Sequence, residues 1–302
     1  DLISGYVGVP KEEIDYVCAG INHMGWFLKI ENDGKDLYPI LRENIEKPEY
    51  YVNEKVRCEV MRHFGYFMTE STGHLSEYLP WFRKNQKALD LYCDEPGFGG
   101  ESGAYYKWGK MIAEKYKDVD FLSYESPKLE PRSAEYCSYI IEALEADKVF
   151  RFNGNIRNNG LIADFPDECC SEVPIYVDRS GLHPTHVGHL PPQCAAANLS
   201  NIRVQGLTVR AGIEGDPELA MAAVAMDPLT SAVCTLAEAR EMTAELLEAE
   251  NQWLPQFEGK TLRKVRTISI PSDVKPVDVP LDPALAIGHR FVELVERETE
   301  RR

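Results

Sequence analysis

The chain has 302 residues, with 33 Lys or Arg against 49 Asp or Glu, so its formal net charge is −16. This acidic balance excludes a typical nucleic-acid-binding surface, which needs clustered positive charge to displace counterions, and it argues against binding to anionic lipid. The sequence has no uninterrupted apolar run of about 18 residues, so we expect no membrane span.

The first predicted strand covers residues 14–31, which are rich in β-branched and aromatic types, and it ends at the hairpin-type turn Asn32-Asp33-Gly34. Residues 84–130 mix Gly, Tyr, Lys and Pro with weak periodicity and are expected to form loops and short helices. Between them, residues 49–65 are predicted to be helical, with an apolar stripe of Val56, Val60, Met61 and Phe64.

In the middle of the chain, a short segment over 149–162 ends in the turn signal Asn158-Asn159-Gly160. A strand over 172–178 and a loop over 180–193 follow. Before them, a helix from Ser133 to Asp147 is predicted to bury the face formed by Tyr136, Ile140, Ile141 and Leu144.

The last third is predicted to be helical. Asp216-Pro217 supplies an N-cap followed by Pro at the first helical position. Thr235 and Glu238 form a capping box for a helix that reaches about residue 252, and a further helix begins near Pro283. Strands early and helices late predict an α+β fold.

The eight cysteines include no CxxC pair, so we expect no structural zinc site. We expect these thiols to be reduced and the protein to be cytoplasmic. Asn198-Leu199-Ser200 matches a glycosylation sequon, but we interpret it as chance because no secretory signal is visible. The chain opens at Asp1 without Met, and we expect it to be the later part of a longer protein.

The first candidate site is the segment Cys18 to Trp26. Gly20 in an apolar strand predicts a close backbone approach. His23, which follows Asn22, is a candidate metal ligand or base, or a hydrogen-bonded core histidine.

The second candidate site crowds Glu70, His74, Glu77 and Tyr78 into nine positions. In a helix His74 and Tyr78 would share a face, with Glu77 beside them. Tyrosine is a poor base unless a cation or metal lowers its pKa. The alternative is a helical turn whose polar face is simply solvated.

The third candidate site runs from Asn153 to Gly160. Its amides suit sugar hydroxyls, and Arg157 offers a fork for a carboxylate or phosphate. Equally, Asn158 and Asn159 suit a plain turn, because Asn tolerates left-handed backbone.

Three further patterns carry less information. His183, His186 and His189 are spaced like ligands but fit no known metal motif, so a loop cluster is the simpler interpretation. The glycines over 97–103 follow no strand, so we reject them as a dinucleotide motif. There is no GxSxG elbow and no P-loop.

Four blocks in order resemble glycoside hydrolase family 4, and the likeness runs from about residue 5 to 256. They are CAGINHM from residue 18, TESTGHLSEYLPW from 69, NGNIRNNGLI from 153, and CCSEVPIYVDRSGLHPTHVGHLPPQCAA from 169. The likeness is greatest to the α-galactosidase/α-glucosidase branch.

The resemblance implies an α-glycosidase that needs NAD and a divalent metal, usually Mn²⁺. In that family the cofactor oxidises C3 of the sugar, a base removes the C2 proton, the glycosidic bond is eliminated, water adds, and C3 is reduced again. The chemistry is reasonable, because a C3 ketone acidifies C2–H and the metal stabilises the resulting enediolate.

By the resemblance, His23 is a metal ligand, Asn22 touches substrate, and the base lies in the segment from His74 to Tyr78, with Tyr78 preferred. The resemblance also implies that His74, Arg157, Asn158 and Asn159 bind substrate, and Arg157, where proline is expected, suggests an anionic sugar such as a uronide. The second metal ligand, a cysteine, would lie before Asp1, and Cys18 is not its replacement.

The family's NAD-binding Rossmann unit has no counterpart in the sequence. We therefore expect residues 1–302 to be the substrate- and metal-binding C-terminal domain, which as a fragment neither binds NAD tightly nor turns over substrate. Self-association into a homo-oligomer is also implied. The alternatives are an α-glucosidase, α-glucuronidase or α-galacturonidase of the same family, a lactate/malate-dehydrogenase-like domain, and a non-catalytic sugar-binding or oligomerisation fragment.

Overall fold

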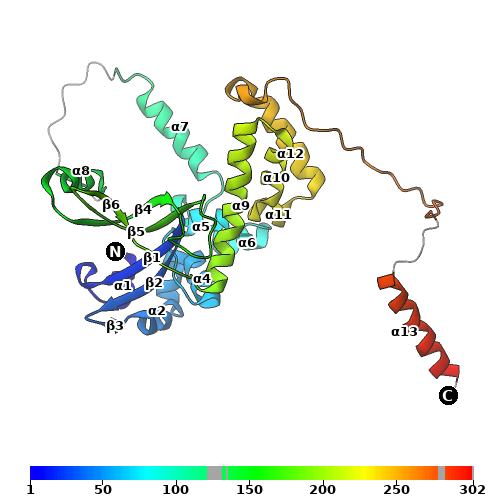
Figure 1. Cartoon of the computed structure of the whole chain (residues 1–302), viewed down its shortest axis with the longest axis horizontal. Helices are drawn as coiled ribbons and strands as arrows, with labels where there is room; N and C mark the ends of the chain where they lie inside the picture. The colour runs from blue at the N-terminus through cyan, green and yellow to red at the C-terminus, as the bar shows by residue number, and fades with distance from the viewer. Residues whose placement is uncertain (121–130, 134, 278–282, 301–302) are drawn as a thin grey trace. The chain divides into compact units, whose positions relative to one another are not determined.

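A computed structural model of the chain describes residues 1–120, 131–133, 135–277 and 283–300. The chain divides into two units, Asp1–Leu262 and Arg263–Arg302. The second unit carries one helix, α13 (Pro283–Glu300), which confirms the helix expected from Pro283. All candidate site residues lie in the first unit (Figure 1). Across the described residues, no helix combines the length and the apolar character that crossing a membrane requires.

The first unit is built on one six-stranded sheet in the order β3-β2-β1-β5-β4, with β6 paired to β5. Each of its ladders is antiparallel. The strands are β1 (Asp15–Ile21), β2 (Met24–Asn32), β3 (Lys35–Asp36), β4 (Phe150–Arg157), β5 (Cys170–Asp178) and β6 (Gly181–Pro184). Together with the surrounding helices this confirms the α+β prediction.

The prediction of one strand over 14–31 was wrong in one respect, because this segment forms two strands. The chain reverses at Asn22-His23, so β1 and β2 form a hairpin with a two-residue turn. The turn predicted after Asn32 is confirmed. Asp33 and Gly34 both have positive φ, 47° and 75°, as a tight hairpin between twisted strands requires.

Eight helices of the described residues precede β4. They are α1 (Leu2–Val7), α2 (Tyr38–Ile45), α3 (Pro48–Tyr51), α4 (Lys55–Phe64), α5 (Thr72–Tyr78), α6 (Gln86–Tyr92), α7 (Ala104–Tyr116) and α8 (Cys137–Ala146), with the short 3₁₀ turns η1 (Lys11–Glu13), η2 (Val52–Glu54) and η3 (Gly97–Gly99). The helix predicted over 49–65 is interrupted by η2. Its stripe of Val56, Val60 and Met61 is buried as expected.

Two sequence predictions in the middle of the chain need correction. Helix α8 packs on β5 and β4 and buries Ala143, whereas Tyr136, Ile141 and Leu144 of the predicted face are exposed. The loop predicted over 180–193 contains β6. The part of the 84–130 prediction that falls on residues 121–130 lies outside the described residues.

The helical part of the first unit begins at Pro192, earlier than the Asp216 cap had indicated. It consists of α9 (Pro192–Glu214), α10 (Pro217–Met226), α11 (Pro228–Val233), α12 (Leu236–Ala249), η4 (Asn251–Trp253) and η5 (Pro255–Phe257). The Asp216 cap and the Thr235–Glu238 capping box are both present as predicted.

The long helix α9 is joined to the hairpin through one buried hydrogen-bond pair. The Trp26 indole Nε1 donates to Asn198 Oδ1 at 2.8 Å, and Asn198 Nδ2 donates to the Met24 carbonyl at 2.8 Å. Both side chains are fully buried. Asn198 therefore cannot be glycosylated in the folded chain, which agrees with the interpretation of its sequon as chance.

Candidate functional site

The hairpin turn between β1 and β2 carries the first candidate residue. His23 has φ of 63°, a left-handed conformation that is uncommon for residues with a side chain and that clusters at functional sites. Gly20 makes the turn possible, because a Cβ there would lie 2.4 Å from the Met24 carbonyl oxygen. The close approach predicted at Gly20 is thus to the partner strand of its own hairpin.

His23 is held by a carboxylate that is distant in sequence. Its Nδ1 pairs with Glu70 Oε2, and the His74 Nδ1 lies 3.7 Å from the other Glu70 oxygen. The two imidazoles stack with centroids 4.8 Å apart and 5° between their planes. Tyr78 also stacks on His23, at 5.7 Å and 17°. We call His23, Glu70, His74 and Tyr78 the His23 cluster.

The electrostatics of the cluster favour a charged Glu70 and a neutral Tyr78. Partial burial alone would raise the pKa of Glu70, but hydrogen bonds from His23 and the Ser71 amide, with the nearby histidines, lower it below its usual value. Burial and the charges of Glu77 and Glu70 raise the pKa of Tyr78. Tyr78 is therefore a protonated phenol in this environment.

A buried arginine positions the segment that supplies Glu70 and His74. Arg57 donates to the Met68 carbonyl at 2.8 and 3.1 Å, stacks 4.5 Å above the ring of Phe67, and pairs with Glu54. Glu54 in turn accepts hydrogen bonds from the backbone and hydroxyl of Thr72, the first residue of α5. This network fixes where α5 starts, and so where His74 and Tyr78 lie.

A polar strip on β4 and β5 lies beside the cluster. Asn155 Nδ2 donates to Asn22 Oδ1 at 3.3 Å, and Asn155 pairs in register with Glu172. Glu172 is half-buried opposite Gly20. Burial raises the pKa of Glu172, whereas a hydrogen bond with Asn153 and the charge of His23 lower it. The effect of burial is the larger, so the pKa lies above its usual value. Asn22 and Asn155 are both exposed and available to a ligand.

The third candidate segment divides into exposed and buried residues. Arg157 ends β4 two residues after Asn155, so the two side chains share a face, and its Nε donates to the Asp167 carbonyl at 3.3 Å. Asn159 is exposed with φ of 42°. Asn158, by contrast, has no exposed surface.

Asn158 holds its own loop. Its Nδ2 donates to the carbonyls of Ile162 and Phe165, each at 3.0 Å, and its Oδ1 accepts from the Ile162 amide at 2.9 Å. A ligand at the surface cannot reach this side chain as it is placed. The structure therefore gives Asn158 a role in the loop and leaves Asn159 and Arg157 as the exposed residues of this turn.

Replacing Asn158 by alanine is expected to destabilise the chain by about 2–4 kcal/mol, because buried backbone groups of Ile162 and Phe165 lose their partners. Urea denaturation measures this. Asn159→Gly, at an exposed position of the same turn, is the matched control and should change stability far less, because glycine adopts the left-handed φ of 42° without strain. Equal losses in the two variants would contradict the loop-holding role.

The His-rich loop does not form one site. His183, on β6, has its Nε2 3.1 Å from Asp178 at the end of β5, whereas His189, beyond β6, has its Nδ1 2.8 Å from Asp164. Within the described ranges, no three His, Cys, Asp or Glu side chains are grouped to hold a metal ion. Cys18 is fully buried and burial raises the pKa of its thiol, so it is unsuited to replace a missing ligand.

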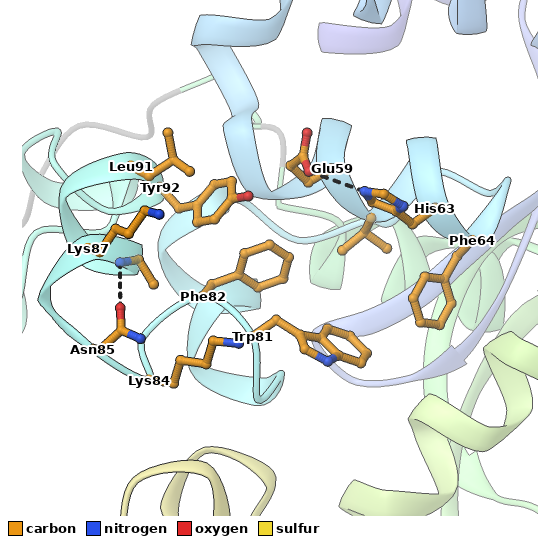
Figure 2. A pocket seen from close by; sticks show the side chains of 12 residues that line it. Glu59, His63, Phe64, Trp81, Phe82, Lys84, Asn85, Lys87, Leu91 and Tyr92 are labelled. Atoms are coloured by element: carbon orange, nitrogen blue, oxygen red, sulfur yellow. Dashed lines mark hydrogen bonds and ion pairs between the residues drawn. The ribbon is translucent and has the colours of Figure 1, made fainter.

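An aromatic pocket of about 540 Å³ lies between α4, α6 and the segment that follows α5. Figure 2 shows the rings of Tyr92, Phe82 and Trp81 one after another along this pocket, with Lys87 on α6 and Lys84 in the segment before it. None of the residues that line it belongs to the His23 cluster. It is separate from the candidate site.

Sequence reasoning placed Glu70 in the second candidate segment and Asn155 in the third without giving either residue a role of its own. It missed Glu172, which gave no signal because only the pairing of β1, β4 and β5 brings it to the hairpin.

The family model described as "Family 4 glycosyl hydrolase C-terminal domain" matches residues 18–230 of this chain. The chain belongs to this family. It is 37% identical over 264 residues to an alpha-galactosidase of Rhizobium meliloti and 36% identical over 257 residues to one of Bacillus subtilis. These alignments cover 85% and 83% of this chain but 54% and 58% of the relatives, so the chain spans little more than half their length.

A solved family 4 fold agrees with this assignment. A 6-phospho-alpha-glucosidase from gut microorganisms, in complex with NAD and Mn²⁺, is similar with a TM-score of 0.62 at 19% identity, over 84% of this chain and 59% of that chain. The likeness establishes the fold of the family 4 domain. Family membership also decides against the lactate/malate-dehydrogenase alternative.

Proposed function

We propose that this chain is the substrate- and metal-binding domain of an α-galactosidase of family 4, acting with NAD and Mn²⁺. The observation that carries the proposal is the His23 cluster, in which a strained histidine is oriented by Glu70 and stacked on His74 and Tyr78. The names of the two relatives at 36–37% identity support galactosides as the substrate class.

The geometry of His23 fits a metal ligand. Metal-binding histidines usually engage a carboxylate through the ring nitrogen that does not touch the metal, which fixes tautomer and orientation. Nδ1 of His23 is engaged in this way by Glu70. Nε2 makes no hydrogen bond or ion pair with the parts of the chain that the structure describes, so it is the nitrogen that would hold Mn²⁺.

The chemistry supplied by bound NAD and Mn²⁺ would be hydride transfer at C3 and polarisation of the oxygens on C2 and C3. The residues of this chain bind and orient the sugar. Asn22 and Asn155 offer amides to its hydroxyls, and Tyr78 Oη would take the proton from C2. Because burial and nearby carboxylates raise its pKa, Tyr78 needs positive charge close by to act as that base.

For NAD we propose that this chain alone gives no tight site. Phosphate binding of the Rossmann type needs a parallel strand–loop–helix unit. Throughout the described ranges the sheet ladders are antiparallel, and the glycines near 97–103 lead into η3 and α7 without a preceding strand. Turnover of a nitrophenyl α-galactoside by the isolated chain, given NAD⁺ and Mn²⁺, would contradict this.

We also propose a cytoplasmic location and self-association. All eight cysteines are free thiols, which supports a reducing compartment. Self-association follows from the family resemblance.

Isothermal titration of the chain tests the substrate class. Methyl α-galactoside and methyl α-glucoside differ only at C4, and a site that hydrogen-bonds the galactose hydroxyl should prefer the galactoside at least about tenfold. Equal binding, or preference for the glucoside, would contradict the proposal. Methyl α-galacturonoside belongs in the same series because Arg157 is exposed, and tighter binding of that ligand would change the substrate class to uronides.

A further inference from the structure

The aromatic pocket between α4, α6 and the segment after α5 takes no part in the His23 cluster. Its volume of about 540 Å³ lies within the range of small-molecule sites. Val60, Phe82 and Ala88, which line it, are buried, so the pocket reaches down to the hydrophobic interior. A ligand that enters it replaces water against apolar side chains, which is favourable.

Aromatic rings follow one another along the pocket (Figure 2). Phe82 meets Tyr92 edge-on at 5.1 Å and Trp81 edge-on at 6.2 Å. On its other side, Trp81 has the ring of Phe64 at 5.5 Å, tilted by 52°. No ring in the described part of the chain stacks parallel on the Trp81 indole, and this residue is 41% exposed. The indole therefore offers a face to a planar ligand.

Most polar side chains that line the pocket are already engaged. Glu59 forms an ion pair with Arg62, lies 3.4 Å from His63 Nε2 and shares a hydrogen bond with the Tyr92 hydroxyl. Asn85 caps α6, because its Oδ1 accepts from an amide of the first turn at 2.9 Å. Few hydrogen-bonding groups remain free, so a sugar or a nucleobase, with polar groups around its rim, fits this pocket poorly.

Two cations of the lining are different. Lys84 and Lys87 are both exposed, and neither ammonium group makes a hydrogen bond or ion pair with the residues that the structure describes. Figure 2 shows Lys84 extending toward Trp81 and Lys87 toward Tyr92. The charge of Glu59 is balanced by Arg62. The unpaired lysines therefore give this pocket a positive rim, although the whole chain carries a net charge of −16.

A flat apolar body with a negative charge at one edge satisfies both features, since the body lies against the rings and the charge meets the lysines. We propose that this pocket binds a small planar aromatic carboxylate, with its ring on Trp81 and its carboxylate between Lys84 and Lys87. The pocket is a second ligand site of the chain, independent of the galactoside site.

Isothermal titration of the full chain with 2-naphthoate tests the proposal, and 2-naphthamide is the neutral probe of similar shape. We expect one naphthoate per chain, bound about five- to tenfold tighter than the amide, because two exposed cations each add a modest attraction. Raising the salt concentration should reduce this preference, since exposed charges are screened. Equal affinity for the two probes would overturn the proposal, as would a wild-type chain that binds no naphthoate.

Replacing the two lysines together isolates the charge. The double variant Lys84→Gln, Lys87→Gln should lose the preference for naphthoate and keep the wild-type affinity for naphthamide. Lys35→Gln is the matched control, because Lys35 is an exposed lysine on β3 that does not line the pocket, and it should keep the preference. A preference that survives in the double variant would reject the carboxylate position.

Replacing the indole isolates the ring contact. Trp81→Ala should weaken the binding of both probes at least about tenfold, whereas Trp253→Ala, at a residue 69% exposed outside the pocket, should leave it unchanged. Binding that survives in Trp81→Ala would place the ligand elsewhere and overturn the proposal. So would a wild-type chain that binds neither probe and whose sedimentation coefficient falls in Trp81→Ala, because the pocket would then be an interface between two copies of the chain.

Discussion

Replacing His23 with alanine is expected to lower the turnover of 4-nitrophenyl α-galactoside by the holoenzyme, supplied with NAD⁺ and Mn²⁺, by about a thousandfold. The orientation of the His23 imidazole is fixed by the Glu70 carboxylate, which pairs with its Nδ1. Loss of the imidazole would remove both the proposed metal ligand and the partner of Glu70. Glu70→Gln, which keeps the shape but loses the charge, should cost about 10- to 100-fold, because it weakens the orientation of His23 and not its ligation.

His63→Ala is the matched control for this pair of variants. His63 lies 3.4 Å from Glu59 and is likewise a histidine paired with a carboxylate, but it is exposed on α4 and outside the cluster. The turnover of the His63→Ala holoenzyme should equal that of the wild type. If His23→Ala kept turnover within about tenfold of wild type, the metal-binding role of His23 would be rejected.

Replacing Trp26 with alanine is expected to destabilise the first unit by about 3–5 kcal/mol, the cost of removing a large buried aromatic side chain. Trp26 is fully buried, stacks on Phe64 at 5.9 Å and donates to Asn198. It therefore connects the hairpin that carries His23 to helix α9. The free energy of unfolding from urea titration measures the effect.

Trp26→Phe separates packing from hydrogen bonding at this position. It retains a ring but leaves Asn198 Oδ1 without its donor, and should cost about 1–3 kcal/mol. Trp253→Ala, at a position 69% exposed, is the control and should stay within about 0.5 kcal/mol of wild type. A Trp26→Ala variant as stable as the Trp253→Ala variant would refute the connecting role of this indole.

Much of the fold could be predicted where the signal is local. The Asp216 and Thr235 side chains cap backbone amides within the next few residues. Asp33 and Gly34 adopt the positive φ values of a tight turn through their own backbone preferences. The turn at Asn22-His23 could not be predicted, because His23 adopts an unfavourable φ that distant contacts with Glu70 and His74 support. Apolar periodicity gave a wrong prediction for α8, where the helix buries the small Ala143 and leaves Ile141 and Leu144 exposed.

The candidate site was predictable to a similar degree. Helical spacing placed His74 and Tyr78 on one face, and both stack toward His23. The prediction that His23 is a metal ligand came from the family resemblance, since a lone histidine gives no such signal by itself. The sequence could not predict which of Asn158 and Asn159 is buried and which is exposed. Both residues suit the turn equally well, and only their burial in the structure distinguishes them.

We propose that one site of this chain brings galactoside and Mn²⁺ together at His23. Paramagnetic relaxation tests it directly, because bound Mn²⁺ broadens the proton signals of a nearby ligand. We predict that Mn²⁺ and the wild-type chain together broaden the H2 and H3 signals of methyl α-galactoside, and that His23→Ala abolishes the broadening while His63→Ala retains it. Equal broadening with the wild-type chain and with His23→Ala would contradict the account.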